Sequence, residues 1–117
     1  LIKIFYTKYE ATNVYNLKNK KIISFAGIGN PQNFFDLLKT NNLNLIEQID
    51  FPDHYKYSNI ELEALIEKAK KKSAILLTTE KDYFRIGEKH KNTINYLKIK
   101  VVIENKNQFI EEIKKYI

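Results

Sequence analysis

The chain of 117 residues contains no cysteine, no methionine and no tryptophan, and it has a single arginine. Without cysteine it can form no disulfide, thiolate nucleophile or zinc–thiolate site, which fits a reducing cytoplasm. No apolar run comes near the roughly 20 residues that span a bilayer, and no signal-peptide pattern is present. We expect a cytoplasmic protein, soluble or at most peripheral to a membrane. Because it begins at Leu1 and not at methionine, we also expect a piece of a longer chain.

The basic excess of the chain has two explanations. A net charge of +6 and a pI near 9.4 are typical of proteins with an anionic partner such as nucleic acid, a phosphorylated substrate or a membrane surface. However, all basic residues except Arg85 are lysine, and isoleucine and asparagine are also abundant. These residues have AT-rich codons, so base composition is an equal explanation. One arginine also disfavours base reading, which relies on bidentate guanidinium groups.

Apolar runs alternate with amphipathic segments along the chain. We expect strands at 21–27, 43–51, 73–79 and 96–104, and helices at 31–41, 59–72, 80–86 and 107–117. Helix-start signals precede the first three helices: Asn30 with Pro31, Ser58 with Glu61, and Thr79 with Asp82. The expected core faces of the first two helices are Phe34, Phe35 and Leu38, then Ile60, Leu62, Leu65, Ile66 and Ala69.

This alternation predicts the fold class. Strands followed by helices favour an α/β fold with a mainly parallel sheet and helices on both faces, a Rossmann-like three-layer arrangement in a single small domain. The first 20 residues are less regular; residues 1–10 have the composition of a strand and 16–20 of a turn.

Ligands of such sheets bind beyond the carboxyl ends of the strands, where three short motifs fall. "GIGNP" (27–31) offers a helix start for an anion, although a tight turn with an Asn-Pro cap is the favoured explanation. "PDH" (52–54) is either a general base with its orienting acid, a metal pair, or a simple turn. "TTEKD" (78–82) is explained by capping except for Lys81. His90 lies among lysines, and we expect it at the surface.

Taken in order, "FAGIGNPQNFF", "FPDHYKYS" and "LLTTEKDYFRI" resemble the C-terminal region of the tetraacyldisaccharide 4'-kinase (lipid A 4'-kinase) family over residues 17–110. Two departures from the family pattern stand out. Asn19 and Asn42 replace usual glycines, which is tolerable in the left-handed conformation. The sequence also contains no G-x-x-x-x-G-K-[ST] motif, so the P-loop of the kinase is missing.

The resemblance implies an ATP- and Mg²⁺-dependent lipid kinase. Its members transfer the γ-phosphate of ATP to the 4'-position of tetraacyldisaccharide 1-phosphate in lipid A biosynthesis. They act at the cytoplasmic face of the inner membrane of Gram-negative bacteria. Residues 1–117 would be the C-terminal α/β domain, whose partner is an N-terminal P-loop kinase domain absent from this chain. The segment alone is expected to be inactive, with no nucleotide or metal ligand of its own.

The resemblance also suggests roles for individual residues. His54 would reach across the interdomain cleft and hydrogen-bond the acidic base of the other domain, while Asp53 fixes either the turn or the imidazole. Lys81 would meet a phosphate or a carboxylate. The other candidates for the cleft are Asn30, Tyr55, Tyr57 and Asp82.

Two functions of other classes are alternatives to the lipid kinase hypothesis. A standalone basic module that binds RNA or another polyanion is supported by the charge and by eight tyrosines that would stack on bases. It is disfavoured by the single arginine and by the scatter of the lysines, so we expect no nucleic-acid partner. An independent hydrolase built on Asp53 and His54 ranks last, because no further ligand or nucleophile is nearby.

Overall fold

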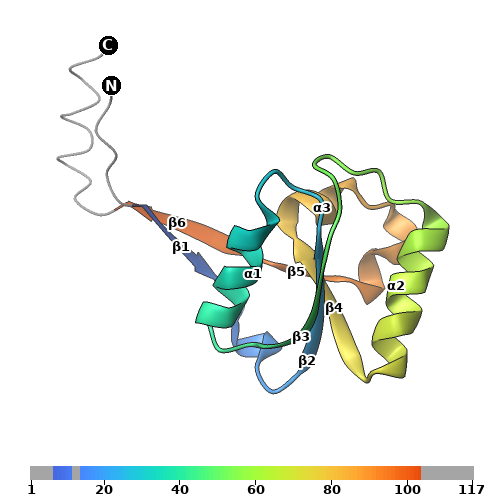
Figure 1. The fold of residues 1–117 in the computed structure, drawn as a ribbon, viewed down its shortest axis with the longest axis horizontal. Helices are drawn as coiled ribbons and strands as arrows, with labels where there is room; N and C mark the ends of the chain where they lie inside the picture. Colours follow the sequence, from blue (N-terminus) through green and yellow to red (C-terminus); the bar gives the residue numbers. More distant parts are fainter. Residues whose placement is uncertain (1–6, 12–13, 104–117) are drawn as a thin grey trace, which may run out of the picture.

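The structure is a computed structural model that describes residues 7–11 and 14–103. Its centre is a four-stranded sheet with the order β3-β2-β4-β5, and every neighbouring pair is parallel (Figure 1). The strands are β2 (Lys21–Ala26), β3 (Asn44–Asp50), β4 (Ala74–Thr79) and β5 (Asn95–Leu97). The α-helices are α1 (Pro31–Thr40), α2 (Asn59–Lys71) and α3 (Glu80–Arg85). The predicted α/β class with a parallel sheet is confirmed.

The sheet has a hydrophobic core on each face, because strand residues alternate in direction. Ile22 and Ala26 of β2 belong to the core on the α1 side. Ile23 and Phe25 point the other way and pack under α2. Figure 1 shows α1 and α2 on opposite sides of the sheet, which is the predicted three-layer arrangement.

The helices begin and end where the sequence signals predict. Asn30 accepts a hydrogen bond from the Asn33 N–H at the start of α1, and Pro31 is its first residue. Ser58 and Glu61 form a full capping box at the start of α2. Asn19 and Asn42 have φ of 64° and 59°, so both adopt the left-handed conformation that glycine usually supplies.

The last predicted strand, 96–104, is wrong as a single element. Its first part is β5, which pairs with β4 in the main sheet. After Lys98 the chain changes partner, and β6 (Ile99–Ile103) pairs antiparallel with β1 (Thr7–Ala11). This two-stranded ribbon leads away from the main sheet (Figure 1). The expected strand at 1–10 is thus partly seen in β1, and the expected helix at 107–117 lies outside the described residues.

Two expectations about burial are wrong. Ile60 is 81% exposed, because it lies about 200° around α2 from the buried Leu62. His90 is only 5% exposed: it belongs to a 3₁₀ helix, η2 (Glu88–Thr93), that contacts α2, so the polar sequence around it did not reveal its burial. A second 3₁₀ helix, η1 (Val14–Leu17), precedes β2 and places Leu17 in the α1-side core.

Candidate functional site

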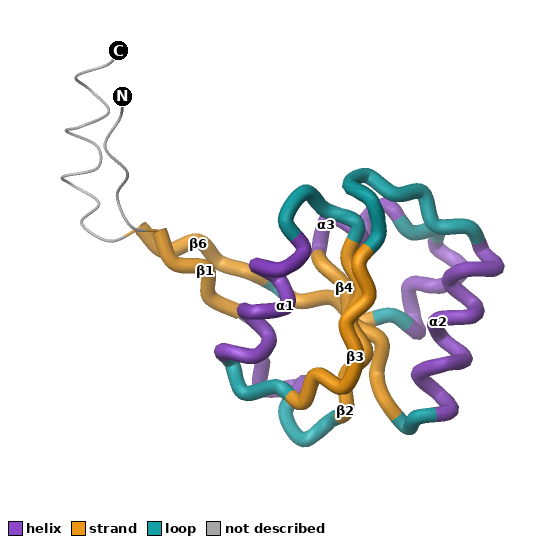
Figure 2. The backbone as a smooth tube through the Cα atoms, in the orientation of Figure 1, coloured by secondary structure: helices purple, strands orange, loops and turns teal. Residues whose placement is uncertain are grey.

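The loops that follow β2 and β3 lie at the same end of the sheet as α3, which directly follows β4 (Figure 2). Between them is a hollow of about 660 Å³. We call this the strand-end hollow, and its lining residues are Ile28, Gly29, Asp53, His54, Lys81, Phe84 and Arg85. Each of the motifs singled out in the sequence contributes to it. The hollow lies beyond the carboxyl ends of parallel strands, the usual ligand-binding position in open α/β sheets.

The Pro-Asp-His turn is anchored to the end of β2. The Phe51 N–H donates to the Ala26 carbonyl at 2.8 Å, and the His54 N–H donates to the Gly27 carbonyl at 3.0 Å. His54 has a φ of 59°, a left-handed conformation that few non-glycine residues adopt, although histidine adopts it more often than most. The backbone of His54 is therefore fixed, while its side chain is 84% exposed.

Asp53 and His54 approach one another, although adjacent side chains usually point apart. Asp53 Oδ2 lies 3.7 Å from His54 Nε2. Gly29 lies beside this carboxylate, and a Cβ at Gly29 would make an ordinary contact of 3.5 Å with Asp53 Oδ2. The Asp53 side chain is about half exposed, so it is an open, solvated group beside the imidazole.

Asp82 is fully buried and joins the elements below the hollow. Its carboxylate accepts from the Gly27 N–H, at 3.1 Å to each oxygen, and from the Thr79 hydroxyl at 2.6 Å. It also accepts from the Tyr57 hydroxyl at 2.9 Å and from Arg85 Nη2 at 2.8 Å. The predicted capping is confirmed, because the Asp82 N–H donates to Thr79 Oγ1. The carboxylate itself does not line the hollow, and its observed role is to hold the surrounding loops together.

Arg85 is the functional candidate that the sequence reasoning missed. Its Nη2 donates to Asp82 Oδ1 and, at 3.0 Å, to the Gly27 carbonyl, and its Nη1 lies 3.5 Å from His54 Nδ1. The signal that would have found it is the i,i+3 spacing from Asp82 on a helix, which brings the two charges together. The single arginine therefore connects the helix, the glycine loop and the histidine turn.

Tyr55 and Tyr57, the tyrosines near the turn, do not line the hollow. Tyr57 packs edge-on against Phe25 and Phe51. Burial, and then the Asp82 carboxylate, raise the pKa of the Tyr57 hydroxyl, so it stays protonated and donates. The Tyr55 hydroxyl donates to Glu61 on α2, and this hydrogen bond raises the pKa of Tyr55.

Of the predicted site residues, the structure brings together Asp53, His54 and Lys81. Lys81 lines the hollow, and among the described residues its ammonium group makes no ion pair or hydrogen bond. The remaining candidates, Asn30, Tyr55, Tyr57 and Asp82, cap helices or support the loops instead. No group of three or more histidine, aspartate or glutamate side chains suited to a metal ion occurs within 7–11 and 14–103.

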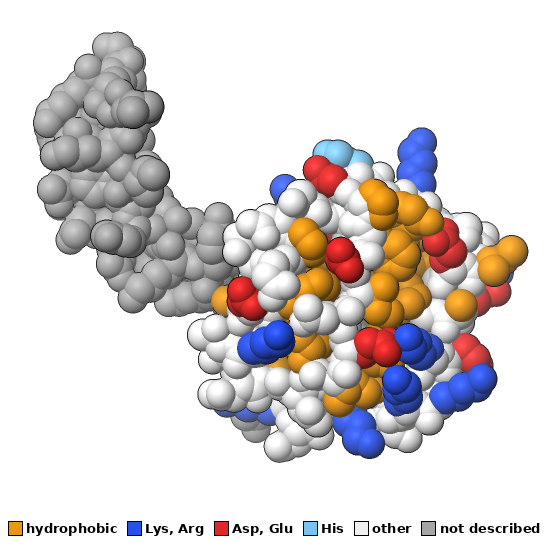
Figure 3. All heavy atoms as spheres, viewed as in Figure 1, with side chains coloured by type: hydrophobic (Ala, Val, Ile, Leu, Met, Phe, Trp, Pro, Cys, Tyr) orange, Lys and Arg blue, Asp and Glu red, His pale blue; other side chains and the backbone are white. Residues whose placement is uncertain are grey.

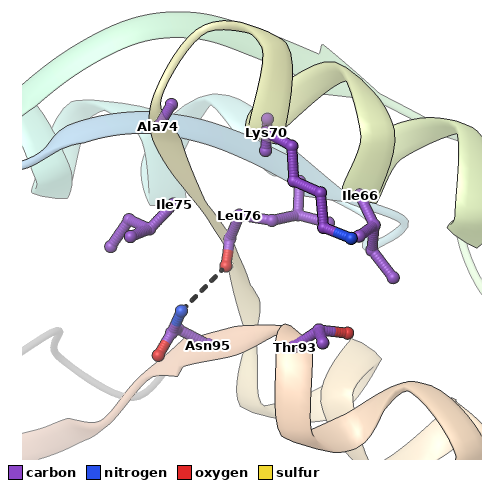
Figure 4. Close-up of a pocket in the computed structure, with 8 residues that line it drawn as sticks. Ile66, Lys70, Ala74, Ile75, Leu76, Thr93 and Asn95 are labelled. Atoms are coloured by element: carbon purple, nitrogen blue, oxygen red, sulfur yellow. Dashed lines mark hydrogen bonds between the residues drawn. The ribbon is translucent and has the colours of Figure 1, made fainter.

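A second, smaller hollow of about 210 Å³ lies between α2 and the strands β4 and β5 (Figure 4). Its walls are mainly apolar, from residues such as Ile66 and Leu76, and Lys70 is its one charged lining residue. The Asn95 side chain donates to the Leu76 carbonyl across it at 3.4 Å. None of the residues singled out by the sequence motifs contributes to this hollow.

Several lysines of the described part of the chain lie beside acidic side chains. Figure 3 shows basic side chains gathered near the end of α2 with acidic ones beside them. Lys68 and Lys72 both pair with Glu47, and Lys89 pairs with Glu63. This mixed pattern is less favourable to a polyanion than an unpaired basic surface would be. Among the helices of the described residues, none is long and apolar enough to cross a membrane.

The fold and the strand-end hollow define a class: an open parallel α/β domain that offers a histidine, a carboxylate and cationic groups beyond the carboxyl ends of its strands. A profile of the family described as LpxK, tetraacyldisaccharide-1-P 4'-kinase, matches residues 3–117. The chain therefore belongs to the tetraacyldisaccharide 4'-kinase family.

Individual relatives agree with this assignment. The chain is 36% identical over 109 residues to the tetraacyldisaccharide 4'-kinase of Pelagibacter ubique, covering 92% of this chain and 35% of that protein. It is 45% identical over 98 residues to the enzyme of Rickettsia bellii, covering 84% and 30% respectively. The chain thus spans about a third of the length of these curated relatives.

A solved structure shares the fold. It is the crystal structure of LpxK from Aquifex aeolicus, described as an "apo" form in complex with ATP. The match has a TM-score of 0.60 at 24% identity and covers 93% of this chain and 35% of the other.

Proposed function

We propose that this chain is part of a kinase that transfers the γ-phosphate of ATP to the 4'-position of tetraacyldisaccharide 1-phosphate, a step of lipid A biosynthesis. Family membership over residues 3–117 supports the proposal. The ordered motifs that carry the family resemblance also meet at one place, the strand-end hollow. Because the chain spans about a third of its relatives, the remaining two thirds would supply the rest of the active site.

In this proposal the nucleotide binds mainly outside the chain, to a P-loop domain that precedes it. The sequence has no phosphate-binding P-loop motif. Mg²⁺ bound with ATP would neutralise charge on the phosphates, but the described residues gather no set of ligands for it. The contribution of this chain is therefore positioning, by the groups that line the hollow.

In this proposal His54 does the positioning, and its backbone conformation is the single observation that carries this role. A left-handed backbone at a non-glycine residue is strained and persists only where surrounding contacts hold it. Here the Gly27 carbonyl holds it, and the imidazole stands in the solvent at the hollow. In this proposal the imidazole would hydrogen-bond an acidic base of the missing domain, which would accept the proton of the sugar hydroxyl.

The other lining residues suit charged partners of the same reaction. Lys81 offers an ammonium group that binds phosphate or carboxylate as a point charge. Asp53 stands beside the imidazole and either orients it or holds the turn. In the cell, the assembled kinase would act at the cytoplasmic face of the inner membrane as a peripheral protein, because its lipid substrate is embedded there.

The test is His54→Ala in a complete kinase that contains this chain. If the imidazole orients the base, kcat should fall by about 10²- to 10⁴-fold while the melting temperature stays close to that of the parent. Asp53→Asn should match that loss if Asp53 orients the imidazole and should be milder if it only shapes the turn. Lys39→Ala, an exposed substitution on α1, is the matched control and should leave kcat unchanged. Near-normal kcat in a well-folded His54→Ala enzyme would overturn the role of His54.

A further inference from the structure

The guanidinium group of Arg85 is held rigidly beside the His54 ring. Nη2 donates to Asp82 Oδ1 at 2.8 Å and to the Gly27 carbonyl at 3.0 Å, while Nε donates to the Lys81 carbonyl at 3.3 Å. These acceptors lie on α3 and on the loop after β2, so they fix both the position and the plane of the group. Nη1 then lies 3.5 Å from His54 Nδ1.

This contact restricts where the imidazole carries its proton. A guanidinium group has only donors and does not lose its proton in proteins. A proton on His54 Nδ1 would point at the protons of Arg85 Nη1, whereas an unprotonated Nδ1 accepts from them. The other ring nitrogen, Nε2, lies 3.7 Å from the Asp53 carboxylate, and a proton on Nε2 is favoured there too.

We propose that Arg85 is a positioning residue that keeps His54 in the tautomer with its proton on Nε2, so that the ring presents a hydrogen-bond donor to the strand-end hollow. The tautomer follows from the contacts of this chain alone. Its use rests on the proposed function: His54 would donate to the carboxylate that acts as base and would not itself receive the substrate proton. Arg85 would thus determine whether the imidazole of His54 acts as a hydrogen-bond donor or as a proton acceptor.

Nitrogen NMR of the ¹⁵N-labelled 117-residue chain tests the tautomer directly. At about pH 8.5, where an ordinary imidazole is neutral, two-bond and three-bond correlations distinguish protonated from unprotonated ring nitrogens. We expect His54 to carry its proton on Nε2 almost entirely. Arg85→Met should raise the Nδ1-protonated fraction severalfold, and Arg85→Lys, which keeps a cationic donor, should largely restore the parent state. His90 serves as the internal reference and should not change.

Two NMR results would contradict the proposal. A parent spectrum dominated by Nδ1–H, or an unchanged tautomer in folded Arg85→Met, would overturn the role of Arg85. If Arg85→Met fails to fold, the parent spectrum and Arg85→Lys still decide the question. None of these measurements depends on kinase activity, so normal kcat in His54→Ala would remove the proposed role of His54 in the reaction and leave the tautomer inference standing.

Kinetics of the complete kinase then test the donor role itself. The amide nitrogen of glutamine can occupy the place of imidazole Nε2, and that of asparagine the place of Nδ1. If Nε2–H is the working donor, His54→Gln should keep a severalfold higher kcat than His54→Asn. Equal loss in both variants, or the reverse order, would overturn the donor role.

Discussion

At the scale of single residues, Asp82 shows how the strand-end hollow is supported from below. A fully buried carboxylate is costly unless its oxygens accept hydrogen bonds and a cation lies nearby. Asp82 meets both conditions through Gly27, Thr79 and Arg85. Its contacts fix loops that are distant in sequence, so we regard its main role as structural.

The first prediction concerns this carboxylate. Asp82→Asn replaces one carboxylate oxygen by an NH₂ group. That NH₂ group would face another hydrogen-bond donor, either the Gly27 N–H or the Arg85 guanidinium group. We expect a loss of about 3 kcal/mol in the free energy of unfolding, measured by urea denaturation. Tyr57→Phe removes one neutral donor to the same carboxylate and should cost about 1 to 2 kcal/mol. An Asp82→Asn protein as stable as the parent would contradict the structural role.

A matched pair of glycines gives the second prediction. A Cβ at Gly27 would lie 2.9 Å from the Tyr57 hydroxyl and 3.1 Å from the Pro52 carbonyl oxygen. Gly27→Ala should therefore destabilise the fold by about 1 to 3 kcal/mol through overpacking, and should displace Tyr57. A Cβ at Gly29 would make only an ordinary contact of 3.5 Å with Asp53. Gly29→Ala is the control and should melt at a higher temperature than Gly27→Ala. A lower melting temperature for Gly29→Ala would refute the argument.

At the scale of elements, the start of α2 is sensitive to acid. The Tyr55 hydroxyl, and then the backbone N–H of Ser58, donate to Glu61 and lower the pKa of its carboxyl group below the usual 4.5. A lowered folded-state pKa means that the ionised carboxylate stabilises the fold above pH 4.5. That contribution is lost as the pH falls through the folded-state pKa.

The third prediction follows from the lowered pKa of Glu61. Glu61→Gln keeps a residue that suits a capping box but removes the charge. The variant should melt at a lower temperature than the parent near neutral pH, and the difference should shrink as the pH falls below 4.5. Melting curves over a pH series test this. A difference that is constant with pH would show that Glu61 stabilises α2 without its charge.

Local signals explain why most elements were predictable from the sequence. The helix starts at Asn30 and Ser58, and the left-handed Asn42, depend on neighbouring residues and were predicted correctly. The break at Lys98 was not predictable, because β5 and β6 form one apolar stretch and differ only in their pairing partners. The burial of His90 likewise depends on a packing partner, α2, that the local sequence does not identify.

The candidate site was predictable only in part, for a related reason. The motifs placed Asp53, His54 and Lys81 at the carboxyl ends of strands, and the structure brings these together. The contact between Arg85 and His54 joins residues separated by 31 positions, and no local pattern gives its geometry. Long-range hydrogen bonds to Asp82 similarly turned Tyr57 inward, although the sequence suggested a cleft-lining side chain.

At the scale of the whole molecule, the fourth prediction concerns nucleotide binding. The chain lacks a P-loop, and the described residues offer no metal-ligand cluster. We expect no measurable binding of ATP with Mg²⁺ to the 117-residue chain by titration calorimetry. A complete kinase that contains the chain is the positive control. Micromolar binding to the chain alone would show that the nucleotide site lies in this part of the protein.

The hydrogen bonds from the Gly27 N–H to Asp82 also lead to a prediction about how the molecule opens. They join α3 to the end of β2 across 55 positions in sequence, so we expect this amide to exchange with solvent deuterium only when the two elements separate. Its exchange should be nearly as slow as that of the buried β2 amides, and much faster in Asp82→Asn. The loop beneath the histidine would then belong to the slowest-opening unit of the protein, even though the imidazole above it stands in water.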